Sequence, residues 1–240
     1  RSVVAVGWTD EDGDRHREQG EGHFIAKLPD KLAVTVGKLG HTGAWAGTDG
    51  RRYWLFDLRE DDEVILYVGD RQREPDPRVR PMFVRPDHLP ALLGLASLGE
   101  QPPAVRDGMP TVDFAAGRIL VLSQDRSIRM ALEPKTGRPR RVELLDERGR
   151  VLVTAKLSKY RLLEQEGKSP GVWPWVPGRI ELASTDKDRT MSLNLNGLVD
   201  EPDRIQDRVF DLSILARKFE PARVIRVDRR EAPADEAPSD

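Results

Sequence analysis

The most metal-like pattern in the sequence is DEDGDRHREQGE at residues 10–21. Carboxylates stand at the first, third, fifth and twelfth positions of this pattern, as they do in a calcium-binding loop: Asp10, Asp12, Asp14 and Glu21. The sixth position is Arg15, whereas the sharp turn of a calcium loop requires glycine there, and no flanking helices are predicted. A solvated loop between two strands therefore explains the pattern better, and we expect no metal site.

Other catalytic chemistry has little support. The four histidines have spacings unlike those of a zinc site: His16, His23, His41 and His88. There is no cysteine, and no nucleophile elbow, P-loop or dinucleotide fingerprint. We expect no catalytic residue and no cofactor. A hydrolase acting on a lipid is a third, weaker hypothesis, and it needs a serine or aspartate beside a histidine inside an apolar pocket.

Composition excludes some partners. The 240 residues carry 39 basic and 41 acidic side chains, a net charge of −2, so no long-range field favours nucleic acid or an anionic membrane. Basic residues such as Arg138, Arg140 and Arg141 are interleaved with acidic ones. No apolar run is long enough for a transmembrane helix. The chain begins at Arg1 rather than Met, so we expect that a secretory signal has been removed.

Alternation of apolar and polar residues dominates the chain and predicts strands at 2–9, 22–28, 31–38, 43–47, 51–58, 63–69, 117–123, 127–134, 139–146, 150–160, 179–185 and 190–198. Asp49-Gly50, within GAWAGTDGRRYWLFDL at 43–58, predicts a tight hairpin. Tight turns favour antiparallel pairing. So many strands should curl, which predicts a mainly β fold: a half-open antiparallel β-barrel of about eleven to twelve strands.

The segment DHLPALLGLASLG predicts one short helix at 87–98, within a lid or linker insertion at 70–110. Residues 210–219 fit either a short amphipathic helix or a last strand and turn. We expect a single domain over residues 1–227 and a disordered tail at 228–240, which is rich in charge, proline and alanine.

Alternate residues of a curled sheet point to its concave side, so the apolar strand faces predict either an ordinary core or an apolar cavity. A leucine-rich helix closing that side favours a lipid-sized pocket. Trp173 and Trp175, in a proline-rich loop, could contact a membrane, clamp an acyl chain, or simply close the mouth of the barrel. The candidate ligand-binding residues are Phe24, Val34, Val36, Trp45, Trp54, Phe56, Leu92, Leu95, Ile128, Met130, Trp173, Trp175, Met191 and Leu193.

The order of these segments resembles the LolA/LolB-type lipoprotein carriers over residues 2–216. The resemblance is carried by KLPDKLAVTV followed by TGAWAGTDGRRYWLFDL, by IRMALEPKTGRPRRVELLDERGRVLVTAKLSKY, and by WPWVPGRIELAST. It implies a half-open barrel with a helical lid over a hydrophobic cavity. It also implies transport of acyl chains or lipoproteins between envelope membranes.

We therefore expect a non-enzymatic lipid or lipoprotein carrier of the periplasm or cell envelope, with a lipid or acylated protein as partner. Contact with a membrane surface, or a lipid anchor to the outer membrane, fits the same hypothesis. The alternative is a structural or protein-interaction module of the envelope on the same fold, with its cavity filled by side chains.

Overall fold

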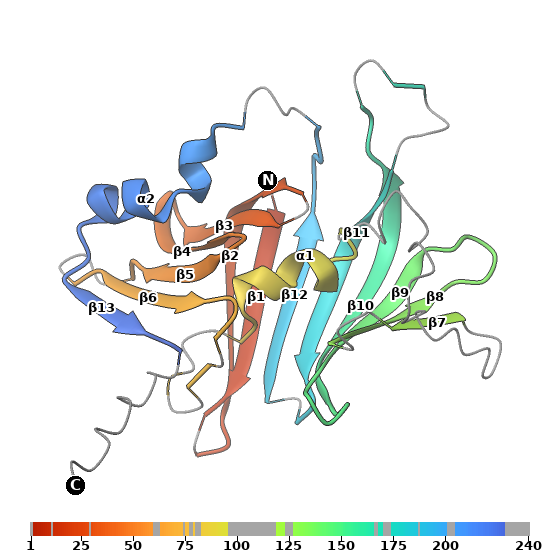
Figure 1. Ribbon diagram of the computed structural model, residues 1–240, viewed down its shortest axis with the longest axis horizontal. Helices are drawn as coiled ribbons and strands as arrows, with labels where there is room; N and C mark the ends of the chain where they lie inside the picture. The colour runs from red at the N-terminus through yellow and green to blue at the C-terminus, as the bar shows by residue number, and fades with distance from the viewer. Residues whose placement is uncertain are drawn as a thin grey trace, which may run out of the picture.

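The computed structural model describes residues 2–10, 12–28, 30–59, 63–73, 75–76, 79, 83–95, 119–122 (backbone only), 127–165, 168–169, 174–186, 188–200 and 205–228. They form one curved sheet of thirteen strands, in the order β13-β6-β5-β4-β3-β2-β1-β12-β11-β10-β9-β8-β7 (Figure 1). Its two edges, β13 and β7, do not pair with each other, so the sheet stays open. The predicted mainly β, half-open fold is confirmed.

Consecutive strands fill each half of the sheet. The first half contains β1 (Ser2–Thr9), β2 (Arg15–Lys27), β3 (Lys31–Lys38), β4 (His41–Asp49), β5 (Arg52–Asp57) and β6 (Ile65–Asp70). The second contains β7 (Ile119–Leu122), β8 (Ile128–Leu132), β9 (Pro139–Leu145), β10 (Val151–Leu162), β11 (Trp175–Ser184) and β12 (Arg189–Leu195). Antiparallel pairing of β1 with β12 joins the two halves.

The remaining elements are short. A 3-10 turn η1 (Pro86–His88) leads into α1 (Leu89–Leu92), and a 3-10 turn η5 (Asp207–Phe210) precedes α2 (Leu212–Phe219). The last strand, β13 (Arg223–Arg226), runs parallel to β6. Each of the twelve predicted strands is present, whereas β13 was not predicted. Residues 210–219 take the helical alternative, and of the predicted helix at 87–98 the part beyond residue 95 lies outside the described residues.

The sheet must be strongly curved, because the seven residues of η1 and α1 contact both β5 and β9. Eight strand-to-strand steps separate β5 from β9 in the sheet order. In a flat sheet these steps would span about 38 Å, whereas seven helical residues extend only about 12 Å. The two halves therefore wrap around α1, which lies across the middle of the sheet in Figure 1.

Aromatic side chains of β5 cover glycines of the strands on either side. Tyr53 lies opposite Gly69 of β6, and a Cβ at Gly69 would stand only 2.4 Å from the Tyr53 ring. Trp54 lies opposite Gly47 of β4, where a Cβ would stand 3.0 Å from the indole. Neighbouring residues of a strand face opposite sides, so these two rings strengthen both faces of the sheet at weak glycine positions. This packing explains why aromatic residues gather on the neighbouring strands β4 and β5.

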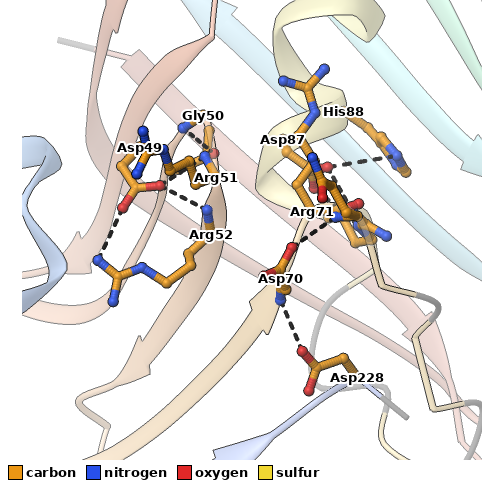
Figure 2. Close-up of polar contacts among 12 residues, drawn as sticks. Asp49, Gly50, Arg51, Arg52, Asp70, Arg71, Asp87, His88 and Asp228 are labelled. Carbon is orange, nitrogen blue, oxygen red and sulfur yellow. Dashed lines mark hydrogen bonds and ion pairs between the residues drawn. The ribbon is translucent and has the colours of Figure 1, made fainter. Parts of the chain in front are cut away.

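The predicted hairpin between β4 and β5 is present, but its turn is held by a side chain. Gly50 alone in the turn has positive φ, at 88°. Asp49 Oδ1 accepts hydrogen bonds from the backbone N–H groups of Arg51 (2.9 Å) and Arg52 (2.7 Å), as Figure 2 shows. An aspartate that caps its own turn in this way is a common alternative to a two-residue turn with two positive φ values.

Helix α2 covers the outer face of β4, β5 and β6. Asp211 caps the helix, because its Oδ1 accepts from the N–H groups of Ser213 (2.8 Å) and Ile214 (3.2 Å). Leu212 and Leu215 then pack on the β5 and β6 side chains of a second apolar cluster. The helix ends at Glu220, whose φ is 45°.

The parallel strand β13 is fastened by a buried carboxylate. The Asp228 side chain is 2% exposed, and it accepts a hydrogen bond from the Asp70 N–H (3.0 Å), as Figure 2 shows, and others from Arg226. Asp228 also pairs with Pro75 as an isolated bridge. The sequence predicts Asp228 as the first residue of a disordered tail. Asp228 belongs to the fold instead, because those hydrogen bonds satisfy its charge. Residues 229–240 lie outside the described residues.

Replacing Leu182→Ala should destabilise the protein by about 2–5 kcal/mol, since Leu182 is 2% exposed in the middle of the sheet. Leu152→Ala is the matched control: Leu152 is 47% exposed, so its loss should change the free energy of unfolding by less than about 0.5 kcal/mol. Urea unfolding followed by circular dichroism measures both. Equal effects of the two substitutions would contradict the assigned faces.

The hold of Asp228 on β13 should weaken in acid. Burial alone would raise the pKa of Asp228, but the hydrogen bonds from Arg226 and from the Asp70 N–H lower it below its ordinary 3.8. A lowered folded pKa means that the stabilisation is present above pH 3.8 and is lost as the pH falls through the folded value. The protection factors of the Arg223–Arg226 amides, which compare observed exchange with the intrinsic rate at the same pH, should therefore fall in acid in the wild type. In Asp228→Asn the same amides should exchange faster at neutral pH, with a weaker pH dependence.

Candidate functional site

Most candidate ligand-binding residues lie on the concave face of the sheet. Cross-strand partners share one face of a sheet, and apolar pairs such as Val142↔Met130 and Leu182↔Met191 carry this surface from strand to strand. Its cluster joins residues of β1–β3 and β8–β12. Nine of the candidates belong to it: Phe24, Val34, Val36, Leu92, Leu95, Ile128, Met130, Met191 and Leu193.

A leucine-bearing segment fills the centre of the concave face. We call residues 83–95, which include η1 and α1, the plug. Leu92 and Leu93 have 0% exposure, and Leu89 has 7%. Gly94, with φ +67°, ends the helical turn, and a Cβ on it would stand 2.9 Å from Leu157 of β10. The plug therefore fills the space at the centre of the concave face.

The plug is tied to the first half of the sheet by Arg85, which contacts Arg71 and Tyr53 and is held in place by an ion pair with Asp87; we call this set of contacts the tether. Arg85 donates from Nε (3.0 Å) and Nη2 (2.7 Å) to the two carboxylate oxygens of Asp87, and also from Nη2 to the Arg71 carbonyl (3.1 Å). Its guanidinium lies 4.4 Å from the centre of the Tyr53 ring. The side chains of Arg85 and Asp87 are 17% and 3% exposed, so this bidentate pair is well protected from water.

Burial shapes the protonation of this tether. It raises the pKa of the Tyr53 hydroxyl, which has no hydrogen-bond partner among the described residues. Burial opposes the charge of Arg85, but the hydrogen bond to Asp87 raises the pKa of Arg85 overall. Both groups keep their ordinary forms, a neutral phenol and a cation, over the physiological range.

Three aromatic candidates lie on the other side of the sheet. The register places Trp45 beside Phe56, and Trp54 beside Gly47 and Val68, on the face opposite to Leu32 and Tyr53. There they pack with Leu212, Leu215 and Phe219 of the α2 region. Alternation along β5 separates two faces correctly, but it cannot tell which one is concave. Trp45, Trp54 and Phe56 therefore support α2 and do not face the plug.

The two loop tryptophans have different standing. Trp173 lies outside the described residues. Trp175 begins β11 and is 43% exposed, with the Arg138 guanidinium 3.5 Å from its ring centre. It is not part of the concave cluster. The sequence shows Arg138 only as one of several dispersed basic residues. Its contact with Trp175 cannot be predicted from the sequence, because the two residues are far apart in the chain.

The metal-like pattern at 10–21 forms a hairpin loop and the start of β2. Asp10 Oδ1 accepts from the N–H groups of Asp12 (3.1 Å) and Asp14 (2.8 Å), and Oδ2 lies 2.6 Å from His16 Nε2. The hydrogen bond with His16 is the main cause that lowers the pKa of Asp10. Glu21 is far along β2, opposite Val3. Among the described residues, no cluster of three or more histidines and carboxylates is arranged to hold a metal ion.

A hollow of about 460 Å³ lies beside β1–β4 and the β3–β4 turn. Val3, Glu21, His23 and Thr35 border it, and alternation puts their side chains on the outer face. Of the candidate residues, only Val36 borders it. Sequence patterns gave no sign of this hollow, since it depends on glycines brought together by strand pairing.

Comparisons with known proteins found matches among solved structures only. No family model matches the chain, and no curated protein matches it. Among solved structures, an outer membrane lipoprotein-sorting protein domain from Vibrio parahaemolyticus is 12% identical, with a TM-score of 0.48, covering 89% of this chain and 90% of that one.

Two further solved structures are similar. A LolA superfamily protein from Nitrosomonas europaea is 14% identical, with a TM-score of 0.46 and coverage of 86% and 89%. A DUF1329 family protein from Desulfovibrio piger is 10% identical, with a TM-score of 0.48 and coverage of 89% and 91%. At these identities and TM-scores the likeness assigns no function to this chain.

None of the helices in the described part of the chain has the length and apolar character to span a membrane.

Breaking the tether should loosen the plug. Asp87→Asn leaves a partly buried Arg85 without its counter-charge, which should destabilise the plug by about 3 kcal/mol. Hydrogen exchange at residues 89–95 should quicken about a hundredfold, while β11 stays protected. The control is Arg150→Gln at the exposed Arg150–Asp146 pair, where Arg150 is 70% exposed and the effect should stay below about 1 kcal/mol. Unchanged plug exchange in Asp87→Asn would refute the tether.

Proposed function

We propose that this protein is a non-catalytic carrier that binds the acyl chains of a lipid or lipoprotein on its concave face. The observation that carries the proposal is that a single short leucine-bearing segment covers an apolar surface shared by eight strands. A sheet of this width in an ordinary core is covered by a second sheet or by long helices. Here the cover consists of aliphatic side chains. An acyl chain has the same apolar character and can take their place on the sheet.

The energies permit that exchange. Exposing the three buried leucines of the plug costs about 5–9 kcal/mol, at about 1.5–3 kcal/mol each. An acyl chain with about twelve buried methylenes contributes about 10 kcal/mol, at about 0.8 kcal/mol each. Binding without any charged contact is therefore feasible. We further propose that the protein acts outside the cytoplasm, in the cell envelope, as its resemblance to lipoprotein carriers implies.

One observation favours the alternative of a structural or interaction module. Leu92 and Leu93 are completely buried, so the concave face is already filled in the structure. A filled core and a closed, ligand-free carrier have the same contacts. They differ in whether the plug can leave, and that difference is measurable.

Titration with a fluorescent fatty acid should show saturable binding to the wild type. Met191→Gln, which places an amide on the concave face, should weaken it about tenfold, because Met191 is a partly buried member of that cluster. The control Leu152→Gln lies on the outer face and should change affinity less than about twofold.

The tether variant separates the two candidates. In a carrier, Asp87→Asn makes the plug easier to displace, so it should bind the fatty acid more tightly than the wild type. In a module with a permanent core, neither protein binds it. Native mass spectrometry of protein from envelope material, searching for co-purified lipid, is an independent check. No binding by wild type or Asp87→Asn would overturn the carrier proposal.

A further inference from the structure

Two large apolar side chains are exposed together where β10 meets the start of β11. Leu162 is opposite Trp175 in the register, and they are 42% and 43% exposed. Cross-strand partners point to the same side of a hairpin, so these two side chains form one apolar patch. The hairpin end that carries them rises from the sheet at the upper right of Figure 1.

One cation contacts this patch directly, and two more lie on the same hairpin end, where alternation puts Arg161, the partner of Val176, on the face opposite to Leu162 and Trp175. The Arg138 guanidinium lies 3.5 Å from the centre of the Trp175 ring. Arg161 folds back toward Lys159: a Cβ built on Gly178 would stand 3.4 Å from Arg161 Nε and 2.7 Å from the Lys159 carbonyl. Both Lys159 and Arg161 are exposed. We call these five residues the rim: Arg138, Lys159, Arg161, Leu162 and Trp175.

The rim cations differ from the other arginines nearby. Arg140, Arg141 and Arg179 each form an ion pair, with Glu133, Glu143 and Glu181 respectively. None of the three rim cations pairs with a carboxylate among the described residues. The acidic residue on this strand end is Glu164, two positions after Leu162. The rim therefore has an excess of positive charge although the whole chain carries −2.

The rim adjoins the end of the plug. A Cβ on Gly94 would lie 2.9 Å from Leu157 and 3.8 Å from Pro139. Pro139 follows Arg138 in the chain, and its carbonyl accepts a hydrogen bond from the Tyr160 hydroxyl. Lys159 has φ 54°, and Tyr160 after it packs against the concave cluster. The rim is thus joined through Pro139 and Tyr160 to the apolar face that we propose for acyl chains.

We propose that the rim docks the protein on an anionic lipid bilayer. Indole and leucine side chains enter the region between headgroups and acyl chains, while arginine and lysine reach the acidic headgroups on their long apolar stems. This combination of charge and exposed aromatic area fits a lipid surface. The inference extends the proposed function, because docking here would bring the end of the plug next to the membrane that supplies the acyl chain.

Vesicle co-sedimentation tests the proposal on the full chain. The wild type should sediment with vesicles of phosphatidylglycerol and phosphatidylcholine but not with phosphatidylcholine alone, and added salt should weaken the binding. Arg161→Gln should reduce binding about fivefold, as expected for one cation near an anionic surface. Trp175→Ala should reduce it by at least a similar factor.

The controls have the same chemistry at the other end of β10. Arg148→Gln removes an exposed arginine from the β9–β10 turn, and Leu152→Ala removes an exposed apolar side chain. Neither should change vesicle binding, and circular dichroism should show all four variants folded. Three results would overturn the proposed membrane docking by the rim: equal losses in Arg161→Gln and Arg148→Gln, binding to neutral vesicles alone, or no sedimentation of the wild type. The last result would point to an acidic protein partner.

The two proposals fail separately. The fatty-acid titration contains no vesicles, so the rim variant Arg161→Gln should bind the fatty acid as the wild type does. Acyl binding without vesicle binding would overturn the rim and leave the carrier proposal intact. Vesicle binding without acyl binding would overturn the carrier proposal and leave the rim as a membrane contact.

Discussion

The dominant constraint on this structure is the need to keep one broad apolar face of a single open sheet away from water. Strands β1–β3 and β8–β12 contribute to that face, and within the described part of the chain no second sheet covers it. Curvature solves most of the problem, because the two halves approach each other and shield one another's side chains. The plug completes the shield, and its leucines are buried because the sheet bends around them.

The two ends of the plug are held by different physics. Its start is fixed by the pair of Arg85 and Asp87 and by the ring of Tyr53, whose contacts are directional and well protected. Its end is held by apolar contact with Leu157 and Pro139, which has no directional bond.

The aromatic residues of β4 and β5 lie on both faces of the sheet and pack against different elements on each face. Tyr53 lies on the inner face, where it meets both Arg85 and the glycine of β6 next to Val227. Trp54 and Phe56 lie on the outer face, where α2 covers them. This side of the sheet is therefore packed on both surfaces and extended by β13. It forms the stable part of the sheet to which the start of the plug is attached.

The sequence by itself determined the strands, the main turns, the short leucine segment and the apolar identity of one strand face, because alternation and turn chemistry are local. Of the fourteen candidate residues predicted from the sequence, nine belong to one apolar cluster. Only the tertiary structure decided that Trp45, Trp54 and Phe56 face α2, since a period of two defines two faces and leaves the choice to packing. The parallel strand β13, the buried Asp228, and the contact of Arg138 with Trp175 were likewise decided by long-range pairing. Each joins residues that are distant in the chain, and no local pattern records such a contact.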